Sequence, residues 1–218
     1  MSLKLTRDFA VLYGIMLGDG CLSLVYGKKK FIAIAGSMAD DVPFFNEVVK
    51  PSIKKLINKD IPIKYIPKKG SIQLNFIKNN LFDYIHSFGF PIGKKGNKLF
   101  IPKIFYEKRL VQYAIRGFFA TDGSLVLTNN NGTLYPRVEA NGIAKDLIKE
   151  ISDFINNQGI NCKFYEAKRK GSNYANEKQQ YRIQINGNIN LRKFEKKIGF
   201  INPKQIERLK YYYGCREN

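Results

Sequence analysis

The amino-acid sequence carries one local pattern twice, and this duplication constrains the fold more than any other feature. Residues 12–20 and 115–123 each contain a glycine, three bulky or apolar residues, a small residue and then Asp-Gly, which puts Asp19 and Asp122 at matching positions. Each segment precedes a strand-like hairpin, an amphipathic helix, a second hairpin and a last helix. This repeated order predicts an α+β fold of two pseudo-symmetric αββαββα halves, because antiparallel hairpins with helices on one face form that class.

Hydrophobic periodicity and turn residues predict the bounds of the elements. In the first half we expect strands at 21–26, 31–35, 63–66 and 71–76, and helices at 9–18, 39–58 and 78–88. In the second half we expect strands at 124–128, 135–140, 161–167 and 179–185, and helices at 144–158 and 189–198. We divide the chain into an N-terminal half at 1–92, a linker at 93–108 and a C-terminal half at 109–218. The similar segments Ile72-Gln-Leu-Asn75 and Ile183-Gln-Ile-Asn186 predict how the last strands of the two halves align.

The charge of the chain indicates its partner. The 218 residues include 37 Lys and Arg against 18 Asp and Glu, a formal net charge of +19, which favours a polyanion such as nucleic acid. No apolar run approaches the ~18 residues of a membrane span, and we expect no signal peptide at the N-terminus. Three widely spaced cysteines and a single histidine, His86, argue against a zinc site, a disulfide framework and a histidine-based nucleophile. We therefore expect an intracellular protein without a membrane partner.

Small residues lie four apart in both motif segments. Gly14 and Gly18 in the first copy, and Gly117 and Thr121 in the second, share one face of a helix. Glycine inside a helix costs about 1 kcal/mol relative to alanine, but small residues at this spacing let two helix backbones approach closely. We predict that the two motif helices pack against each other, and that Gly20 and Gly123 end them in a left-handed conformation.

Asp19 and Asp122 would then lie at the C-terminal ends of the two helices. The helix dipole is negative there, which disfavours a carboxylate by on the order of 0.3–1 kcal/mol. A lone Asp-Gly is a turn signal, but two copies in the same frame indicate a metal site. Hard divalent cations bind carboxylates and the free carbonyls of a helix end, and Mg²⁺ placed against phosphates supports phosphodiester hydrolysis.

The paired segments at 12–20 and 115–123 resemble the double signature of LAGLIDADG homing endonucleases. Further resemblance to two-motif, single-chain members lies at Gly93-Lys-Lys-Gly-Asn-Lys98, Ile101-Pro102-Lys103 and Arg116-Gly117-Phe118. The resemblance implies a saddle-shaped monomer that acts as a pseudo-dimer, with the motif helices at its central interface. It also implies Mg²⁺-dependent cleavage of both strands of a long double-stranded DNA target, leaving cohesive ends. Mn²⁺ is then expected to substitute for Mg²⁺, and Ca²⁺ to bind without supporting cleavage.

The resemblance also assigns roles to individual residues. Asp19 and Asp122 correspond to the metal ligands, with the carbonyls of Gly18 and Thr121 as helpers. Relatives add a basic or amide residue in each half that assists catalysis. The candidates for that role here are Asn141, whose counterpart is expected at Gly36, and the lysines Lys95, Lys98 and Lys204, which could equally be phosphate-contacting or solvated side chains.

Alternating polar residues in the strands predict a DNA-facing side of each sheet. Amide and arginine side chains make bidentate contacts with base edges in the major groove, which admits a two-stranded ribbon. The residues expected on these faces are Ser71, Gln73, Asn75, Arg137, Glu139, Asn141, Gln180, Arg182, Gln184 and Asn186. The clusters Lys28–Lys30 and Lys168-Arg169-Lys170, at hairpin tips, are expected to contact phosphates.

Three other functions remain to be weighed against the endonuclease. An intron-RNA-binding maturase on the same fold is the main alternative, with intron RNA as its partner, although both acidic residues are present. A DNA-binding regulator would be expected to carry an added domain, and an intein would need flanking splicing segments, for which the 218 residues leave no room. An archaeal or organellar origin is an expectation from the resemblance alone.

Overall fold

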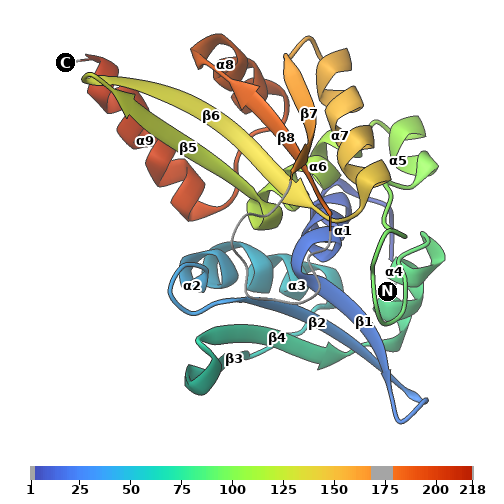
Figure 1. Ribbon diagram of the computed structural model, residues 1–218. Helices are drawn as coiled ribbons and strands as arrows, with labels where there is room; N and C mark the ends of the chain where they lie inside the picture. The colour runs from blue at the N-terminus through green and yellow to red at the C-terminus, as the bar shows by residue number, and fades with distance from the viewer. Residues whose placement is uncertain (1–2, 168–178, 218) are drawn as a thin grey trace.

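The computed structural model describes residues 3–167 and 179–217 and places two four-stranded antiparallel sheets on either side of a central helix pair (Figure 1). The expected α+β class and the αββαββα order of both halves are confirmed. Lys168, Arg169 and Lys170 lie outside the described residues, so their predicted phosphate contacts stay predictions. No helix within the described ranges is long and apolar enough to cross a membrane.

The first half begins with the motif helix α1 (Arg7–Asp19) and the hairpin of β1 (Gly20–Val25) and β2 (Lys29–Ser37). A continuous helical segment follows, made of α2 (Val42–Phe44), the π-helical η1 (Phe45–Val49) and α3 (Lys50–Ile57). The wide π turn comes just before Pro51, which has no N–H to donate to the preceding turn. The half ends with β3 (Ile63–Ile66), the short η2 (Pro67–Lys69), β4 (Ser71–Ile77) and α4 (Asn79–Ser87).

The second half repeats this order after the short helix α5 (Lys103–Glu107). Its elements are α6 (Val111–Asp122), β5 (Gly123–Asn130), β6 (Thr133–Gly142), α7 (Lys145–Asn157), β7 (Cys162–Ala167), β8 (Gln180–Asn186) and α8 (Asn188–Lys197). A further helix, α9 (Pro203–Glu217), lies beyond the repeat and contacts β5. The sequence periodicity predicted neither α5 nor α9.

The strand orders β1-β2-β4-β3 and β5-β6-β8-β7 are the same topology, so the register gives a residue-by-residue alignment of the halves. Ile34 pairs with Gly20, and Ala140 pairs with Gly123, directly after the two motif helices. The counterpart of Asn141 is therefore Ala35, and the predicted match to Gly36 is wrong by one residue. Leu74 opposite Ile34 corresponds to Ile183 opposite Ala140, so the predicted alignment of the last strands is wrong by two residues.

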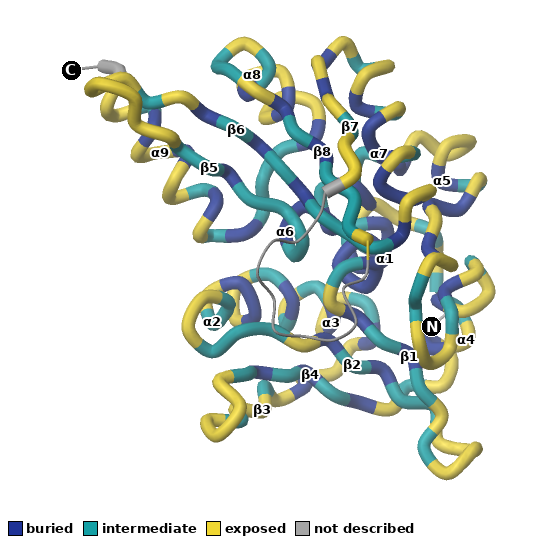
Figure 2. The backbone as a smooth tube through the Cα atoms, in the orientation of Figure 1, coloured by how far each residue is buried: buried dark blue, intermediate teal, exposed yellow. Residues whose placement is uncertain are grey.

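One face of each sheet packs against helices and forms the core, while the other stays partly accessible (Figure 2). In β2 and β4 the buried side chains are Ile32, Ile34, Ile72, Leu74 and Phe76, which alternate with less buried neighbours. Val138, Ala140, Ile183 and Ile185 are their equivalents in β6 and β8. Since successive side chains of a strand point to opposite faces, the polar residues between them share the accessible face.

Helices α1 and α6 pack backbone to backbone between the sheets (Figure 1). A Cβ atom added to Gly14 would lie 1.9 Å from the Ala114 carbonyl oxygen, and one added to Gly117 would lie 2.1 Å from the Val11 carbonyl oxygen. Gly18 is equally close to α6, because its added Cβ would lie 2.0 Å from Thr121 Oγ1. Only glycine allows these approaches.

The predicted left-handed ends of the motif helices are wrong. Gly20 has φ −85° and ψ 159°, and Gly123 has φ −100° and ψ 160°, so both are extended and begin the next strand. Their lack of a side chain serves packing instead, because an added Cβ would lie 2.4 Å from Met16 Cα in the first case and 2.5 Å from the Phe119 carbonyl oxygen in the second. Left-handed glycines follow the final helices of the two halves, at Gly89 and Gly199, where the sequence predicted those helices to end.

Candidate metal centre and nucleic-acid interface

The two motif aspartates end α1 and α6, and the close helix packing brings them to one centre. Asp122 Oδ2 lies so near α1 that a Cβ on Gly18 would be 2.6 Å from it. Asp19 is the more exposed of the two carboxylates, and Asp122 is half-buried. Two acidic side chains therefore meet where both helix dipoles are negative.

The surroundings make ionisation of both carboxylates unfavourable. Loss of hydration among the packed helix ends raises the pKa of Asp19 to about 6, and the nearby charge of Asp41 adds to this effect. The same desolvation, together with the charge of Asp19, raises the pKa of Asp122 to about 7. The Lys95 ammonium opposes both shifts without cancelling them. The centre thus has more negative charge than its own residues compensate.

Lys95, from the segment between α4 and α5, is the cation at this centre. Its Nζ donates to the Leu17 carbonyl oxygen at 3.0 Å, to that of Met16 at 3.4 Å, and to that of Gly18. Burial lowers the pKa of Lys95, while Asp122 and Asp19 raise it in partial opposition. The ammonium therefore satisfies carbonyls at the end of α1, of which that of Met16 also accepts from the Gly20 N–H.

The end of α6 is satisfied differently, by two buried amides of the C-terminal segment. Asn202 Nδ2 donates to the Ala120 carbonyl oxygen at 2.8 Å. Gln205 Nε2, on α9, donates to the carbonyl oxygens of Phe119 at 2.6 Å and Gly123 at 2.9 Å. The sequence repeat could not indicate Asn202 or Gln205, because both lie beyond its second copy.

A cavity of about 360 Å³ opens beside the acidic pair on the side of the second half. Lys95, Asp122 and Asn141 line it together with Gly18. Asn141 Oδ1 accepts a hydrogen bond from Arg182 Nε at 2.7 Å, which fixes the amide orientation. The structure thus brings Asp19, Asp122, Lys95, Asn141 and Gly18 together.

Two lysines proposed as catalytic helpers, Lys98 and Lys204, do not line this cavity. Lys98 is exposed and forms no ion pair within the described residues. Lys204 Nζ pairs with Asp40 Oδ1, which joins α9 to the loop after β2 across the two halves. A catalytic role for Lys204 does not fit this position, because its charge is compensated by Asp40 rather than by the acidic centre.

The first half has no amide at the position equivalent to Asn141. Ala35 stands there, and the adjacent Gly36 has no room for a side chain, since an added Cβ would lie 2.6 Å from Phe45 Cε2 and 3.1 Å from Asp41 Oδ2. Asp41 is itself held by the Ser37 N–H at 2.7 Å. The two sides of the centre therefore differ chemically.

The accessible face of the second sheet carries a connected polar row. Arg137 Nε lies 2.8 Å from Glu139 Oε2, which also accepts from Gln184 Nε2 at 3.3 Å. Register places Gln180, Arg182 and Asn186 on the same face. In the first half, Ser71, Gln73 and Asn75 occupy the accessible face of β4. All the polar strand residues singled out from the sequence thus lie on the two accessible faces.

The lysines at the first hairpin tip divide between the two faces of the sheet. Lys28 and Lys29 are exposed. Lys30 precedes the buried Ile32 by two residues and points to the helix side, where its Nζ lies 2.5 Å from Asp83 Oδ1. A phosphate contact by Lys30 therefore does not fit the structure.

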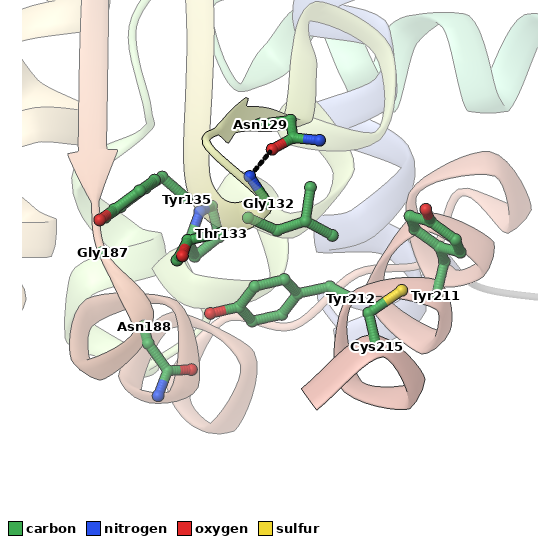
Figure 3. Close-up of a pocket in the computed structure, with 11 residues that line it drawn as sticks. Asn129, Gly132, Thr133, Tyr135, Gly187, Asn188, Tyr211, Tyr212 and Cys215 are labelled. Atoms are coloured by element: carbon green, nitrogen blue, oxygen red, sulfur yellow. Dashed lines mark hydrogen bonds between the residues drawn. The ribbon is translucent and has the colours of Figure 1, made fainter. Parts of the chain in front are cut away.

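A second, larger cavity of about 610 Å³ has neither aspartate of the acidic pair in its lining (Figure 3). It lies between the β5–β6 hairpin, the start of α8 and the end of α9, where Tyr211, Tyr212 and Cys215 line it opposite Thr133. Asn129 Oδ1 accepts from the Gly132 N–H at 2.9 Å and closes the hairpin at its rim. Among the described residues, the lining contains no carboxylate, so this cavity does not share the chemistry of the acidic pair.

The donor set at the acidic pair fits a hard divalent cation. Within the described part of the chain, no group of three or more His, Cys, Asp or Glu side chains could hold a metal ion. Two carboxylates with raised pKa values, next to a helix-end carbonyl, leave ligand positions for water and for phosphate oxygens.

Comparison with known proteins identifies related sequences and folds. Residues 110–199 match the family model described as a LAGLIDADG-like domain. An uncharacterised protein of Methanocaldococcus jannaschii is 27% identical over 216 residues, covering 96% of this chain and 22% of that protein, so the chain spans about a fifth of the length of this relative.

Solved structures share the fold of the whole chain. The homing endonuclease I-DmoI in complex with DNA and Ca has a TM-score of 0.64 at 16% identity, covering 94% of this chain and 97% of its own. I-WcaI bound to its DNA recognition sequence has a TM-score of 0.63 at 13% identity, covering 96% and 88%. The LAGLIDADG meganuclease I-AabMI bound to uncleaved DNA has a TM-score of 0.57 at 14% identity, covering 98% and 91%. Residues 110–199 are thus similar to a LAGLIDADG-like domain, and the chain as a whole shares the two-half, single-chain fold of these solved structures.

Proposed function

We propose that this chain is a site-specific endonuclease that hydrolyses both strands of a long double-stranded DNA target with a divalent metal and leaves cohesive ends. The observation that carries the proposal is the meeting of Asp19 and Asp122 at the unfavourable ends of two glycine-packed helices. Desolvation raises the pKa of both carboxylates, so their ionisation at this position destabilises the folded state. A bound cation would compensate the negative charge of the two carboxylates and so remove this destabilisation.

Mg²⁺ is the proposed metal, with Mn²⁺ as a substitute and Ca²⁺ as a binding ion that does not support cleavage. Structures of I-DmoI with DNA and Ca, and with DNA and Mn, are consistent with such a site in this fold. Asp19 and Asp122 would hold the ion with the carbonyl of Thr121, whereas the carbonyl of Gly18, the other helper expected from the sequence, accepts from Lys95 Nζ. When bound, a divalent ion polarises the phosphate and lowers the pKa of a coordinated water.

Side chains around the centre would position the reacting groups. Lys95 carries positive charge beside both carboxylates, where it can stabilise charge that develops on a phosphate. Asn141, held by Arg182, offers an oriented amide on the cavity wall. Lys98, exposed on the linker, fits a phosphate contact instead.

Each sheet would occupy the major groove of one half-site. We assign residues 1–92 and 109–218 to the two half-sites, with 93–108 as the linker that delivers Lys95. The polar rows on β4, β6 and β8 supply amides and guanidinium groups for base edges. Lys28 and Lys29 would contact phosphates and add affinity that does not depend on sequence. The protein would work as an intracellular monomer with pseudo-dimeric symmetry.

Cleavage selection tests the proposal. The protein is incubated with circular DNA carrying a randomised insert, with Mg²⁺ or with EDTA, and linear products are sequenced. We expect enrichment of one asymmetric site, cut on both strands only with Mg²⁺. Asp19→Asn and Asp122→Asn should abolish cutting, while Asp153→Asn, an exposed aspartate paired with Lys149, should retain it.

Uncut DNA with Mg²⁺, Mn²⁺ and every sequence tried would overturn the endonuclease proposal. Tight binding of intron RNA in the same preparation would then support the maturase alternative. Cleavage that persists in both aspartate variants would instead show that the hydrolytic site lies elsewhere.

A further inference from the structure

We propose that the first-half sheet recognises a thymine-rich half-site through contacts with thymine methyl groups, whereas the second-half sheet uses hydrogen bonds. This inference rests on the DNA-binding function proposed above and concerns the chemistry of its substrate. It comes from a difference between equivalent positions in the two halves, which the shared strand register identifies.

The central strand of each sheet shows the difference. On β6 the accessible face carries Arg137, Glu139 and Asn141, whose side chains are all polar. The register makes Phe31, Ala33 and Ala35 their counterparts on β2, since Ile34 and Ala140 occupy the same place relative to the motif helices. Three side chains with hydrogen-bonding groups are thus replaced by three purely hydrocarbon ones.

These hydrocarbon side chains are not core residues. Ile32 and Ile34, between them, are 1% and 0% exposed and form the core, whereas Ala35 is exposed and Phe31 and Ala33 are partly accessible. Val25 and Ile77 extend the same face, and Ile77 is 53% exposed. The accessible face of the first-half sheet therefore carries an apolar strip, whereas the equivalent positions on the second-half sheet are polar.

The polar groups next to this strip are largely engaged with each other. Asn75 Nδ2 donates to Gln73 Oε1 at 2.9 Å. Asn75 Oδ1 and Ser71 Oγ are buried atoms that no solvent or base edge can reach without rearrangement. The exposed cations on this face, Lys29 and Lys64, lie at its margins, one near the hairpin tip and one on the edge strand β3. Gln73 Nε2 on β4 and Ser23 on β1, opposite Phe31, lie beside the strip, while the side chains of the strip itself offer base edges no donor.

Thymine is the base that such a surface fits. In the major groove thymine alone among the four bases presents a methyl group, and alanine and phenylalanine side chains contact it. Alternate residues of a strand lie about 6.6 Å apart, close to two base-pair steps of about 3.4 Å. Phe31, Ala33 and Ala35 can therefore follow about four base-pair steps, and the small alanines let the strand approach the groove floor.

The first experiment is a binding selection with the Asp122→Asn variant, which retains both sheets and should not cut. A randomised duplex library is enriched by retention on the protein and sequenced. We expect one half-site rich in thymine on either strand and another of mixed sequence. The Ala33→Asn variant should change the preferred bases only within the thymine-rich half-site, and Arg137→Ala only within the other.

The second experiment removes the methyl groups alone. Deoxyuridine replaces thymidine in the selected duplex, first in one half-site and then in the other, which leaves every hydrogen-bonding group in place. Burial of one methyl contributes about 0.8 kcal/mol, so each replacement in the thymine-rich half should weaken binding about fourfold. Replacement in the other half is the matched control and should leave affinity unchanged.

The outcomes separate this inference from the proposed function. A selected site whose Ala33-dependent half lacks thymine, or equal affinity for thymidine and deoxyuridine duplexes, overturns the inference and leaves the endonuclease proposal standing. Binding without any enriched sequence overturns both.

Discussion

Replacing Asp122 by asparagine should stabilise the metal-free protein. Burial and the neighbouring Asp19 raise the pKa of Asp122 from its ordinary 3.8 to about 7, so the folded state holds the proton more tightly than the unfolded chain does. Between these two values the folded protein binds more protons, and stability falls as the pH rises. Asparagine has nearly the same shape and carries no charge, so it removes this unfavourable ionisation.

The magnitude follows from the size of the pKa change. Each tenfold change in acidity corresponds to 1.36 kcal/mol, which gives an upper value of about 4 kcal/mol at pH 8. Asp122 keeps some contact with solvent, and its loss also removes a favourable partner of Lys95, so we expect about half of this, about 2 kcal/mol. At pH 5 only part of the titration has occurred, and the gain should shrink to about 1 kcal/mol. For a chain of this size 2 kcal/mol corresponds to a rise of about 4–8 °C in Tm.

Urea or thermal unfolding in EDTA at pH 8 and pH 5 measures this effect. Asp153→Asn is the control, since Asp153 is exposed and pairs with Lys149 one helical turn away, and its change should stay within about 0.5 kcal/mol at both pH values. Added Mg²⁺ should stabilise the wild-type protein more than Asp122→Asn. If Asp122→Asn is less stable than wild type at pH 8, the carboxylate stabilises the fold and the reasoning from its unfavourable position is refuted.

Three further predictions use the same structure. Gly117→Ala would place a methyl carbon 2.1 Å from the Val11 carbonyl oxygen and should cost about 3 kcal/mol or more in urea unfolding, whereas Gly214→Ala, whose added Cβ would meet no atom of another part of the described chain within 4 Å, should change stability by less than about 1 kcal/mol; equal effects would show that α1 and α6 tolerate separation. Gln205→Leu leaves two carbonyl oxygens at the end of α6 without their donor and should cost about 2–3 kcal/mol in the same assay, and a neutral result would contradict its role in ending that helix. The logarithm of DNA affinity should fall linearly with the logarithm of salt concentration, and Lys29→Gln should reduce the slope by about one without changing sequence preference; an altered preference would assign Lys29 to base contacts.

Much of this architecture follows from local sequence patterns. The period-2 and 3.6 spacings located the strands and helices of both halves, and glycines four apart indicated a close helix pair, because each of these features depends only on neighbouring residues. Strand alternation also predicted which face of each sheet remains accessible, and Gln73 and Arg182 lie on the predicted faces. These predictions needed no knowledge of how distant segments meet.

Register between distant strands was less accessible to sequence reasoning. The similar segments Ile72–Asn75 and Ile183–Asn186 suggested an alignment of the two halves that differs by two residues from the one that the strand register gives. Polar and apolar side chains alternate along a strand, so a shift of two residues produces an equally similar match. The same limit affected Asn141, whose true counterpart is Ala35. The prediction of left-handed glycine ends was wrong for another reason. Glycine is required at positions 20 and 123 because neighbouring atoms leave no room for a Cβ, and not because the backbone has a positive φ.

The groups that complete the acidic centre come from outside the repeat, which is why the repeat could not identify them. Lys95 satisfies the end of α1 from the linker, and Asn202 and Gln205 satisfy the end of α6 from the C-terminal segment. A symmetric dimer of two copies of residues 1–92 would therefore keep both aspartates and lose all three of these contacts. The duplicated motif specifies where the carboxylates lie, but the helix ends that carry them are completed by single, unrepeated segments, so the two sides of the centre are chemically unequal although their aspartates match.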